Sequence, residues 1–427
     1  MEQTKFTRVG EEMFHQVLEN GLNVFVFPKP EFQKGYAFFA TNYGGMDMRF
    51  CLDGEWHDTP AGVAHYLEHK MFDTEDGNAL QDLAANGASP NAFTSSALTG
   101  YYFESTEKFE ENLRILLSFV CVPWFTKESL DKEQGIIGQE IGMIEDNPDW
   151  KVFMNLMAAL YQSHPIRVSV AGSVESISHI TAETLYACHK AFYDPANMVL
   201  CVAGSVDPEH ICDVAREILP KTPGPIALKD YGEKEGERVA QSVIETAMEV
   251  SAAIYQLGYK GDAPKKGEDG LRQELVAELA LESLLGNSSP LYAKLYREGL
   301  INQNYSYAYE SYPGCSFLCV GGESKDPYAL RKAVSDEAAR IGRDGIDGRL
   351  WERLKKGVYG SKVRSLNSFE NLCVGQAQAF FAGYDFLRFA DLFASITKAD
   401  AEDLIARWVT EERTALSIVT PKGGAEA

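Results

Sequence analysis

An internal repeat constrains the fold of this chain more than any other feature. VAHYLEHKMF at residues 63–72 lines up with VAELALESLL at 276–285, an offset of 213 residues, and ISHITAETL at 177–185 lines up with ITKADAEDL at 396–404, an offset of 219. A strand-like run ending in glycine precedes each copy of the first segment, and an apolar strand-like run closes each half. Two similar offsets in the same order indicate that one fold occurs twice.

The segment between the two halves has the composition of a linker. LPKTPGPIALKDYGEKEGERVA, around residues 219–240, combines proline, glycine and charged side chains, which favour turns over regular structure. The chain has 427 residues, more than one ordinary hydrophobic core can hold. We therefore expect one domain at residues 1–222, a linker at 223–240 and a homologous domain at 241–427.

The composition narrows the class of protein. With 45% hydrophobic and 24% charged residues, the chain is typical of soluble globular proteins. Its formal net charge of −22 argues against a nucleic-acid partner, which calls for a basic surface. The same charge is compatible with cationic peptide substrates, although a negative surface more often serves solubility alone.

Two further observations bear on the compartment. The first residues, MEQTKFTRVGEEMF, lack the apolar segment of a signal peptide, and no apolar run reaches the length of a membrane span. The eight cysteines are scattered through apolar stretches without a C-x-x-C pair, which is typical of core thiols. We expect a reduced cytoplasmic protein with no membrane contact.

The first copy of the repeat carries a metal-binding pattern, H-x-x-E-H, formed by His65, Glu68 and His69. On a helix, side chains four residues apart share one face, so the two imidazoles can hold one metal ion. Glu68 is close enough to reach a water on that ion. The order is the reverse of the zincin motif and marks the inverzincins. The alternative is a buried helix with two incidental histidines.

A catalytic zinc usually has three protein ligands and one open position. The candidate source of the third ligand is an expected helix at 126–145, where Glu133 and Glu140 stand two turns apart and face the same way. Gly135 and Gly138 would permit close approach of this helix to another. The alternative for a glutamate pair of this kind is a solvated acidic face.

These segments together resemble the pitrilysin/insulinase family of inverzincin zinc metallopeptidases, which includes the mitochondrial processing peptidase and insulin-degrading enzyme. The resemblance rests on TPAGVAHYLEHKMF, on the E-x6-E spacing and on ASPNAFTSSALTGYYFES. NGLNVFVFPKP, HPIRVSVAGSVESISHIT and FYDPANMVLCVAG extend it over nearly the whole chain. One departure is Lys70, which stands where the family usually has a hydrophobic residue.

The resemblance implies an α+β fold of two homologous domains, each a mostly antiparallel sheet with helices packed on one face. Only the first domain would carry the metal, one Zn²⁺ per chain. By the same resemblance, Glu140 is the third ligand beside His65 and His69. Glu68 would be the catalytic base, and Glu133 an auxiliary acid near the site.

The resemblance also implies residues that bind substrate. The strand containing Asn91, Ala92 and Phe93 would pair with an extended peptide, although Asn91 also suits a turn. The family's arginine–tyrosine pair in the second domain has a candidate in Arg297 with Tyr305 or Tyr307. The spacing departs from the family pattern by at least one residue, so a surface arginine and packing tyrosines are the alternative.

The resulting hypothesis is a zinc-dependent endopeptidase, a hydrolase that cleaves peptides or unfolded segments with metal-activated water. The runner-up is a non-catalytic assembly or scaffold subunit of a processing peptidase complex. A structural zinc is a third interpretation, but such sites favour four ligands and cysteine, and no cysteine lies near the motif. Because the family encloses substrate between two halves of about this length, we expect a homodimer or a heterodimer with a related subunit.

Overall fold

The computed structural model describes residues 1–423, which form two compact units. Neither unit is continuous in sequence. Unit 1 comprises residues 1–141, 168–231 and 363–390, and unit 2 comprises residues 142–167, 232–362 and the chain from residue 391 onward.

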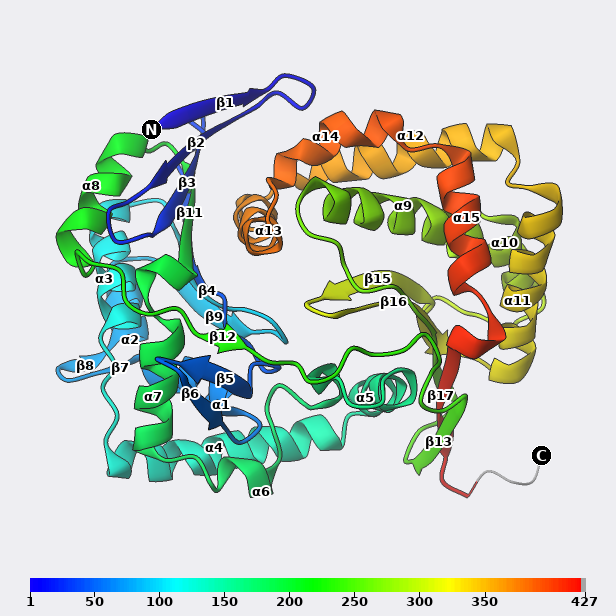
Figure 1. The fold of residues 1–427 in the computed structure, drawn as a ribbon, viewed down its shortest axis with the longest axis horizontal. Helices are drawn as coiled ribbons and strands as arrows, with labels where there is room; N and C mark the ends of the chain where they lie inside the picture. The colour runs from blue at the N-terminus through cyan, green and yellow to red at the C-terminus, as the bar shows by residue number, and fades with distance from the viewer. Residues whose placement is uncertain (424–427) are drawn as a thin grey trace. The chain divides into compact units, whose positions relative to one another are not determined.

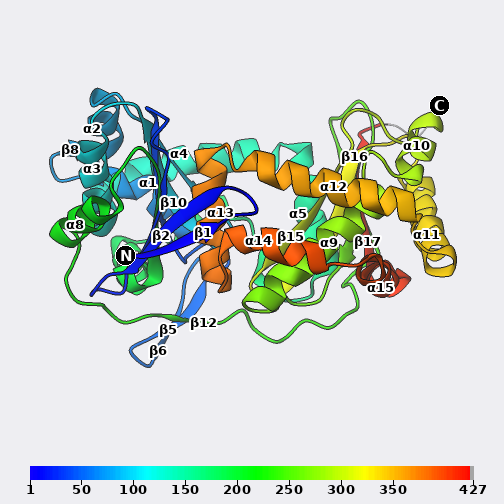
Figure 2. The same cartoon turned by 90° about the horizontal axis from the view of Figure 1, so that it is seen from above.

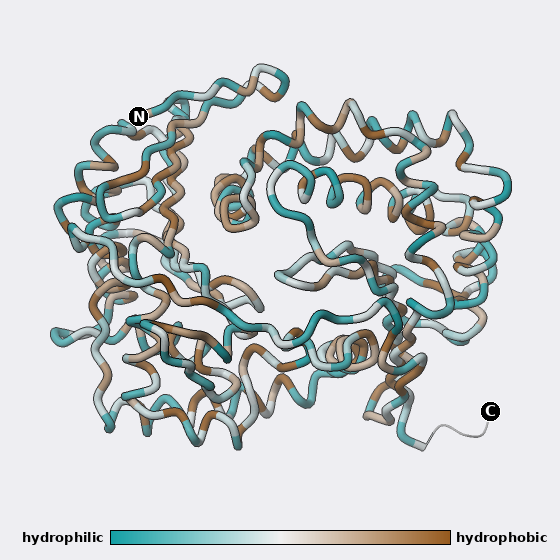
Figure 3. The backbone as a smooth tube through the Cα atoms, in the orientation of Figure 1, coloured by the Kyte–Doolittle hydropathy of each residue, from teal (hydrophilic) through white to brown (hydrophobic). Residues whose placement is uncertain are grey.

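Unit 1 is built on a seven-stranded sheet with the order β1-β2-β3-β11-β4-β10-β9 (Figure 1). All neighbours are antiparallel except β3 and β11, which run parallel. The central strands β4 and β11 are buried along their whole length, and Figure 3 shows the hydrophobic residues that follow the strands of this sheet. The strands span Glu2–Phe6 (β1), Glu11–Val17 (β2), Asn23–Pro28 (β3), Gly35–Thr41 (β4), Ser89–Thr94 (β9), Thr99–Ser105 (β10) and Met198–Gly204 (β11).

Unit 2 is built on a five-stranded sheet with the order β13-β17-β14-β16-β15. Here too one pair, β13 and β17, is parallel and the others are antiparallel. Read outward from the parallel pair, this is the same arrangement as β3-β11-β4-β10-β9 in unit 1. The strands span Val243–Met248 (β13), Ile254–Lys260 (β14), Ser306–Tyr312 (β15), Cys315–Glu323 (β16) and Thr414–Pro421 (β17). The expected α+β fold with two related, mostly antiparallel sheets is confirmed.

The helices follow the same duplication. Figure 1 shows α3 and α8 on one side of the unit 1 sheet and α13 on the other, and Figure 2 shows the same separation. The main helices of unit 1 are Val63–Met71 (α1), Ala79–Ala85 (α2), Phe109–Cys121 (α3), Lys127–Glu145 (α4), Ala182–Phe192 (α7), Pro208–Ile218 (α8) and Phe369–Ala382 (α13). Those of unit 2 are Pro148–Leu160 (α5), Glu268–Leu285 (α9), Pro290–Arg297 (α10), Pro327–Asp344 (α11), Gly348–Ser365 (α12) and Lys398–Trp408 (α15).

Two exchanged helices explain why the compact units differ from the contiguous domains expected at 1–222 and 241–427. α5 precedes the linker in sequence but packs on β14 and β17 of unit 2, whereas α13 follows the linker but packs on β4 and β11 of unit 1. The fit of α5 is close, because a Cβ at Gly258 on β14 would lie 2.9 Å from Leu156 Cδ1. Packing of apolar faces, rather than position along the chain, decides which unit each helix joins.

Helix caps correct the register of the second repeat. Thr181 caps α7 and Thr397 caps α15, each by accepting a backbone N–H bond three residues later. These two threonines are 216 residues apart, and so are the first residues of β11 and β17. The alignment of 177–185 with 396–404 at an offset of 219 was therefore three residues out of register.

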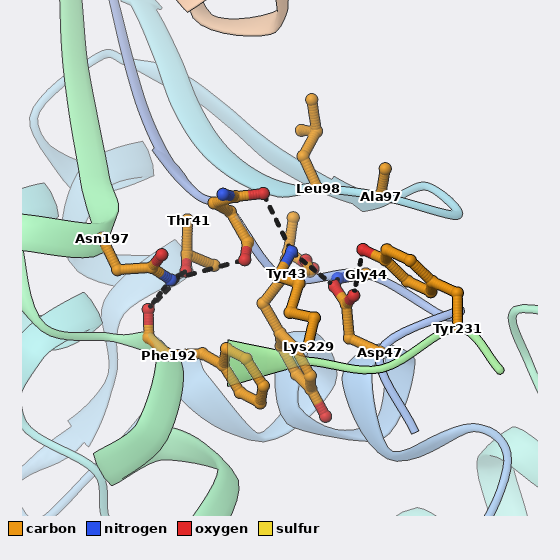
Figure 4. A network of polar contacts seen from close by, with 12 residues as sticks. Thr41, Tyr43, Gly44, Asp47, Ala97, Leu98, Phe192, Asn197, Lys229 and Tyr231 are labelled. Carbon is orange, nitrogen blue, oxygen red and sulfur yellow. Dashed lines mark hydrogen bonds and ion pairs between the residues drawn. The ribbon is translucent and has the colours of Figure 1, made fainter. Parts of the chain in front are cut away.

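The linker is held by side-chain hydrogen bonds both before and after residue 231, where unit 1 ends and unit 2 begins. In unit 1 the buried Asp47 accepts bonds from Lys229 Nζ at 2.9 Å, Tyr231 Oη at 2.8 Å and the Gly44 N–H at 2.8 Å (Figure 4). In unit 2, four residues beyond Tyr231, the Glu235 carboxylate accepts bonds from Lys260 Nζ and from the backbone N–H groups of Gln162, Ser163 and His164. The linker is thus ordered chain held by long-range bonds, not a free tether.

The remaining strands and α-helices are short. They are the strands Arg49–Leu52 (β5), Glu55–Asp58 (β6), Asp73–Thr74 (β7), Gly77–Asn78 (β8) and Leu228–Lys229 (β12), and the helices Val174–Ile177 (α6) and Phe389–Leu392 (α14). Across residues 1–423, every helix is too short or too polar to cross a lipid bilayer. All eight cysteines have free thiols, and six of them are buried.

Candidate metal centre

Helix α1 presents its motif on the side that faces away from the core. Gly62 precedes the helix with φ of +97°, and a Cβ there would lie 2.7 Å from the carbonyl oxygen of Ala171. Tyr66 Oη donates to the carbonyl oxygen of Leu130 at 2.6 Å, which ties α1 to α4. The buried residues of α1 are Val63, Ala64, Tyr66, Leu67, Lys70 and Met71. His65, Glu68 and His69 are left half-buried on the opposite face.

The two histidines of α1 and one glutamate of α4 converge. His65 Nε2 lies 3.6 Å from Glu140 Oε1, and His69 Nε2 lies 3.6 Å from Glu140 Oε2. One ligand atom from each of the three residues falls within 4.8 Å of the others. Ligand atoms bound tetrahedrally at ~2.1 Å to zinc stand about 3.4 Å apart, so this separation fits such an ion. Among the described residues, no other group of three or more meets the same criterion.

Glu133 contacts a histidine rather than the point of convergence. Its Oε1 lies 3.0 Å from His69 Nδ1 and accepts a hydrogen bond there. That bond places the ring hydrogen on Nδ1 and leaves the Nε2 lone pair directed at Glu140, as in many metal-binding histidines. For His65 Nδ1, which is buried, the described part of the chain supplies no hydrogen-bond partner. Glu133 therefore orients only one of the two rings.

Burial sets the protonation of the two residues most enclosed by the site. It lowers the pKa of His65 to about 4, with a further contribution from the neighbouring His69, so the imidazole is neutral at pH 7 and able to bind a metal. Burial also raises the pKa of Glu68, against the opposing hydrogen bond from Thr94. A carboxylate with a raised pKa is suited to take up a proton.

Thr94 is a residue of the site that the sequence analysis did not single out. Its Oγ1 donates to Glu68 Oε2 at 2.6 Å, which holds that carboxylate in one orientation. Thr94 directly follows Phe93 in the NAFTS segment, so its position was the available signal. Only the folded structure, in which β9 packs beside α1, shows that Thr94 reaches the carboxylate of Glu68.

The predicted substrate strand lies at the edge of the unit 1 sheet. β9, which carries Asn91, Ala92 and Phe93, pairs with β10 on one side, and no described strand pairs with its other side. Asn91 Oδ1 accepts a bond from the Ala92 N–H at 2.9 Å. An edge of this kind offers main-chain groups to an incoming extended peptide.

The two members of the predicted arginine–tyrosine pair have different surroundings in the structure. Arg297 ends α10, is exposed, and donates from Nε to the carbonyl oxygen of Ala293. Tyr305 Oη donates to the carbonyl oxygen of Leu285 at 2.8 Å, and its ring packs against that of Tyr292. The hydroxyl of Tyr305 is thus engaged inside unit 2.

The structure also bears on two expectations about individual residues of unit 1. Gly135 and Gly138 were expected to permit close helix packing, but a Cβ at either position would meet open space, so that prediction was wrong. Lys70, the departure from the family pattern, is buried, and its ammonium pairs with Asp73 at the end of α1. A lysine is tolerated there because its charge is compensated locally.

Comparison with known proteins identifies the family. The model described as "Insulinase (Peptidase family M16)" matches residues 53–173, and the model described as "Peptidase M16 inactive domain" matches residues 179–358. The chain belongs to the M16, or pitrilysin/insulinase, family of peptidases. It is 38% identical over 423 residues to an uncharacterised zinc protease of Bacillus subtilis (strain 168), YmfH, covering 98% of this chain and 99% of that one.

Solved structures agree on the fold. A putative M16-like peptidase from Alicyclobacillus acidocaldarius matches with a TM-score of 0.93 and 33% identity, over 96% of this chain and 98% of that one. The first half of the periplasmic protease PqqL from Escherichia coli matches with a TM-score of 0.75 and 16% identity, over 96% and 92% of the two chains. At that lower identity the likeness concerns the fold alone.

Proposed function

We propose that this chain is a zinc-dependent endopeptidase that hydrolyses peptides or unfolded segments. The observation that carries the proposal is the convergence of His65, His69 and Glu140 on one point, with Glu68 beside them. Two imidazoles and one carboxylate form a donor set typical of catalytic zinc, which keeps a fourth position open. The eight free thiols suit the reducing cytoplasm that we propose as its location.

The chain's own residues supply the proton transfers and the binding of substrate. A bound zinc ion contributes Lewis acidity, which activates water and polarises the scissile carbonyl. Glu68, held at one oxygen by Thr94, accepts a proton from the attacking water and passes it to the leaving amine. Glu133 keeps His69 in the ligating orientation. The edge of β9 at Asn91 and Ala92 aligns the peptide through main-chain bonds.

The second candidate is a non-catalytic scaffold subunit. The observation in its favour is the description "inactive domain" for the family model that matches residues 179–358. That model covers most of unit 2, whereas the converging ligands belong to unit 1 and stand at the positions of the metallopeptidase motif. The complete donor set therefore favours the enzyme.

A chelator-reversible cleavage assay tests the proposal. The purified chain is incubated with a library of internally quenched, unstructured peptides, and its zinc content is measured in the same preparation. We expect cleavage that stops on chelation and returns on addition of zinc, and no cleavage by the Glu68→Gln variant. A preparation with one zinc per chain that cleaves no member of the library would support the scaffold instead.

We further propose that the working enzyme is a pair of subunits, either identical or related. The PqqL fragment that matches 96% of this chain is the first half of a longer protease, so a single chain corresponds to about half of that protein. A second half would hold the peptide from another side, and such positioning can lower a barrier by several kcal/mol. Sedimentation of the active species decides the matter. Full activity in a strictly monomeric chain would overturn the pairing, and a dimer inactivated by Arg297→Ala would indicate a homodimer.

A further inference from the structure

Unit 2 holds a cavity of about 590 Å³ between α9, α12 and β15. In the duplicated topology these elements correspond to α1, α4 and β9, which build the candidate metal centre of unit 1. The sequence repeat places Glu278 and Glu282 of α9 where His65 and His69 stand in α1. The cavity therefore occupies the counterpart of the metal site, and its volume is in the range of small-molecule pockets.

The charges at one end of this cavity do not balance. Glu278 Oε1 accepts a bond from Lys362 Nζ at 2.7 Å, but Glu278 Oε2 is buried and lacks a partner in the described part of the chain. Glu282 Oε2 accepts a bond from Tyr307 Oη at 2.7 Å, which neutralises no charge. In these contacts the ammonium group is paired with Glu278, and the donor to Glu282 is neutral. A buried acceptor without a donor is costly, so a ligand that donates hydrogen bonds gains from binding there.

The titration of Glu278 agrees with this surplus of negative charge. Burial raises the pKa of its carboxyl, the ammonium of Lys362 opposes that effect, and the carboxylate of Glu274, one helical turn earlier, adds to it. The cavity's other cation is remote. Arg353 is nine residues from Lys362 along α12, roughly 13 Å, and its Nη2 lies 3.5 Å from the carbonyl oxygen of Ser288.

The remaining walls suit a long side chain that ends in a cation. Tyr307 and Tyr309, two residues apart on β15, project to the same side of the strand, and aromatic rings attract cations. Leu281 and Val358 offer apolar surface for an aliphatic stem. A metal ion is a poorer occupant, because within residues 1–423 the carboxylates here form no cluster of three ligands.

We propose that this cavity binds the ammonium or guanidinium group of a lysine or arginine side chain in a peptide, with Glu278 and Glu282 as its acceptors. The peptide nature of the ligand rests on the proposed function, whereas the preference for a cation rests on the cavity alone. A net charge of −22 favours the approach of such peptides.

Binding of matched peptides tests the proposal without turnover. The full chain carrying Glu68→Gln is titrated by calorimetry with two unstructured peptides that differ only in one lysine replaced by norleucine. We expect the lysine peptide to bind about tenfold more tightly or better, as for a hydrogen bond to a charged group. When Glu282→Gln or Glu278→Gln is added to this chain, we expect most of that preference to be lost and the affinity for the norleucine peptide to stay the same.

The control is Glu352→Gln, an exposed glutamate of α12 outside the cavity, which should keep the full preference. Glu282→Gln can still accept the bond from Tyr307, so it loses charge without losing its contact. Equal preference in all variants would overturn the proposal. Spermidine is titrated in the same way. If it binds more tightly than the lysine peptide, and the same two substitutions weaken its binding, the claim that the cation belongs to a peptide is overturned. Because no cleavage is measured, an inactive wild type would refute the peptidase function and leave this result standing.

Discussion

The two copies of one fold place different partners around a carboxylate at corresponding helices. In unit 1, Glu140 lies 3.6 Å from the imidazoles of His65 and His69, and burial lowers the pKa of His65 so that this ring is neutral at neutral pH. In unit 2, Glu278 faces the ammonium of Lys362 at 2.7 Å. The same pair of helices therefore carries a candidate metal site in one copy and an ion pair in the other. The residue types at a few positions decide between them.

Lys362 also makes the corresponding place in the second copy unsuited to a metal ion. It stands on α12, the counterpart of α4, and contacts α9 much as Glu140 of α4 contacts α1. A charged ammonium cannot donate a lone pair to a metal ion, and it repels a divalent cation. The chain thus supplies internally in unit 2 a positive charge at the place that corresponds to the candidate metal ligands of unit 1.

The largest expected effect separates the chemistry of unit 1 from its ion binding. Glu68→Gln should lower kcat by at least ~10²-fold because an amide accepts no proton from water. Zinc content should stay at one per chain, since Glu68 is not among the converging ligands. Peptide cleavage and atomic absorption on one preparation measure both. Glu75→Gln, an exposed glutamate just after α1, is the matched control and should keep full activity.

The next prediction tests the ligand set. Glu140→Ala removes one of three converging groups, and we expect the zinc content of the purified chain to fall from about one to near zero. Glu145→Ala, five residues further on the same helix and exposed, should retain the ion. If Glu140→Ala and the unmodified chain carry equal zinc, another residue is the third ligand and the contrast with unit 2 fails.

A smaller effect is expected for the residue behind His69. Glu133→Gln weakens the acceptor at His69 Nδ1, and loss of such a partner typically costs 10–100-fold in metal affinity. Competition with a chromogenic chelator measures that affinity. A fall in kcat at unchanged zinc affinity would return Glu133 to the role of auxiliary acid that the family resemblance implies.

Much of the candidate site follows from the sequence because its signals are local. The spacing of His65 and His69 fixes one helix face, and the seven-residue spacing of Glu133 and Glu140 fixes another. The strand containing Asn91, Ala92 and Phe93 was also expected, and the structure shows it as β9, paired with β10. Periodicity within one element carries this information without any knowledge of the neighbours.

Contacts between distant segments carry no such signal. The bond from Thr94 to Glu68 joins residues 26 apart, and the bond from Lys229 to Asp47 joins residues 182 apart. Nothing in the apolar face of α5 or α13 tells which of two similar sheets it will cover. Duplication makes this ambiguity worse, because either sheet offers a comparable surface. The exchange of the two helices therefore emerged only from the packed structure.

The smallest expected effect concerns a second carboxylate of unit 2 that a lysine neutralises. Glu235 Oε2 accepts from Lys260 Nζ at 2.8 Å, and Oε1 accepts from the backbone N–H groups of Gln162, Ser163 and His164. Burial alone would raise the pKa of this carboxyl, but these donors lower it to about 2. In the unfolded chain it is about 4.3. The stabilisation is therefore complete above that value and is lost as pH falls from about 4.3 to about 2.

Glu235→Gln should remove this part of the acid sensitivity. Linkage with these two pKa values gives a loss of about 1.5 kcal/mol in the free energy of unfolding between pH 5 and pH 3, in the unmodified chain but not in the variant. Denaturant titrations at the two pH values measure it, and subtracting the variant cancels every other titrating group. Glu233→Gln, exposed and two residues earlier, should behave as the unmodified chain does. Parallel pH dependence in all three would mean that Glu235 is no more strongly neutralised than a surface carboxylate, and that unit 2 does not rely on internal cations.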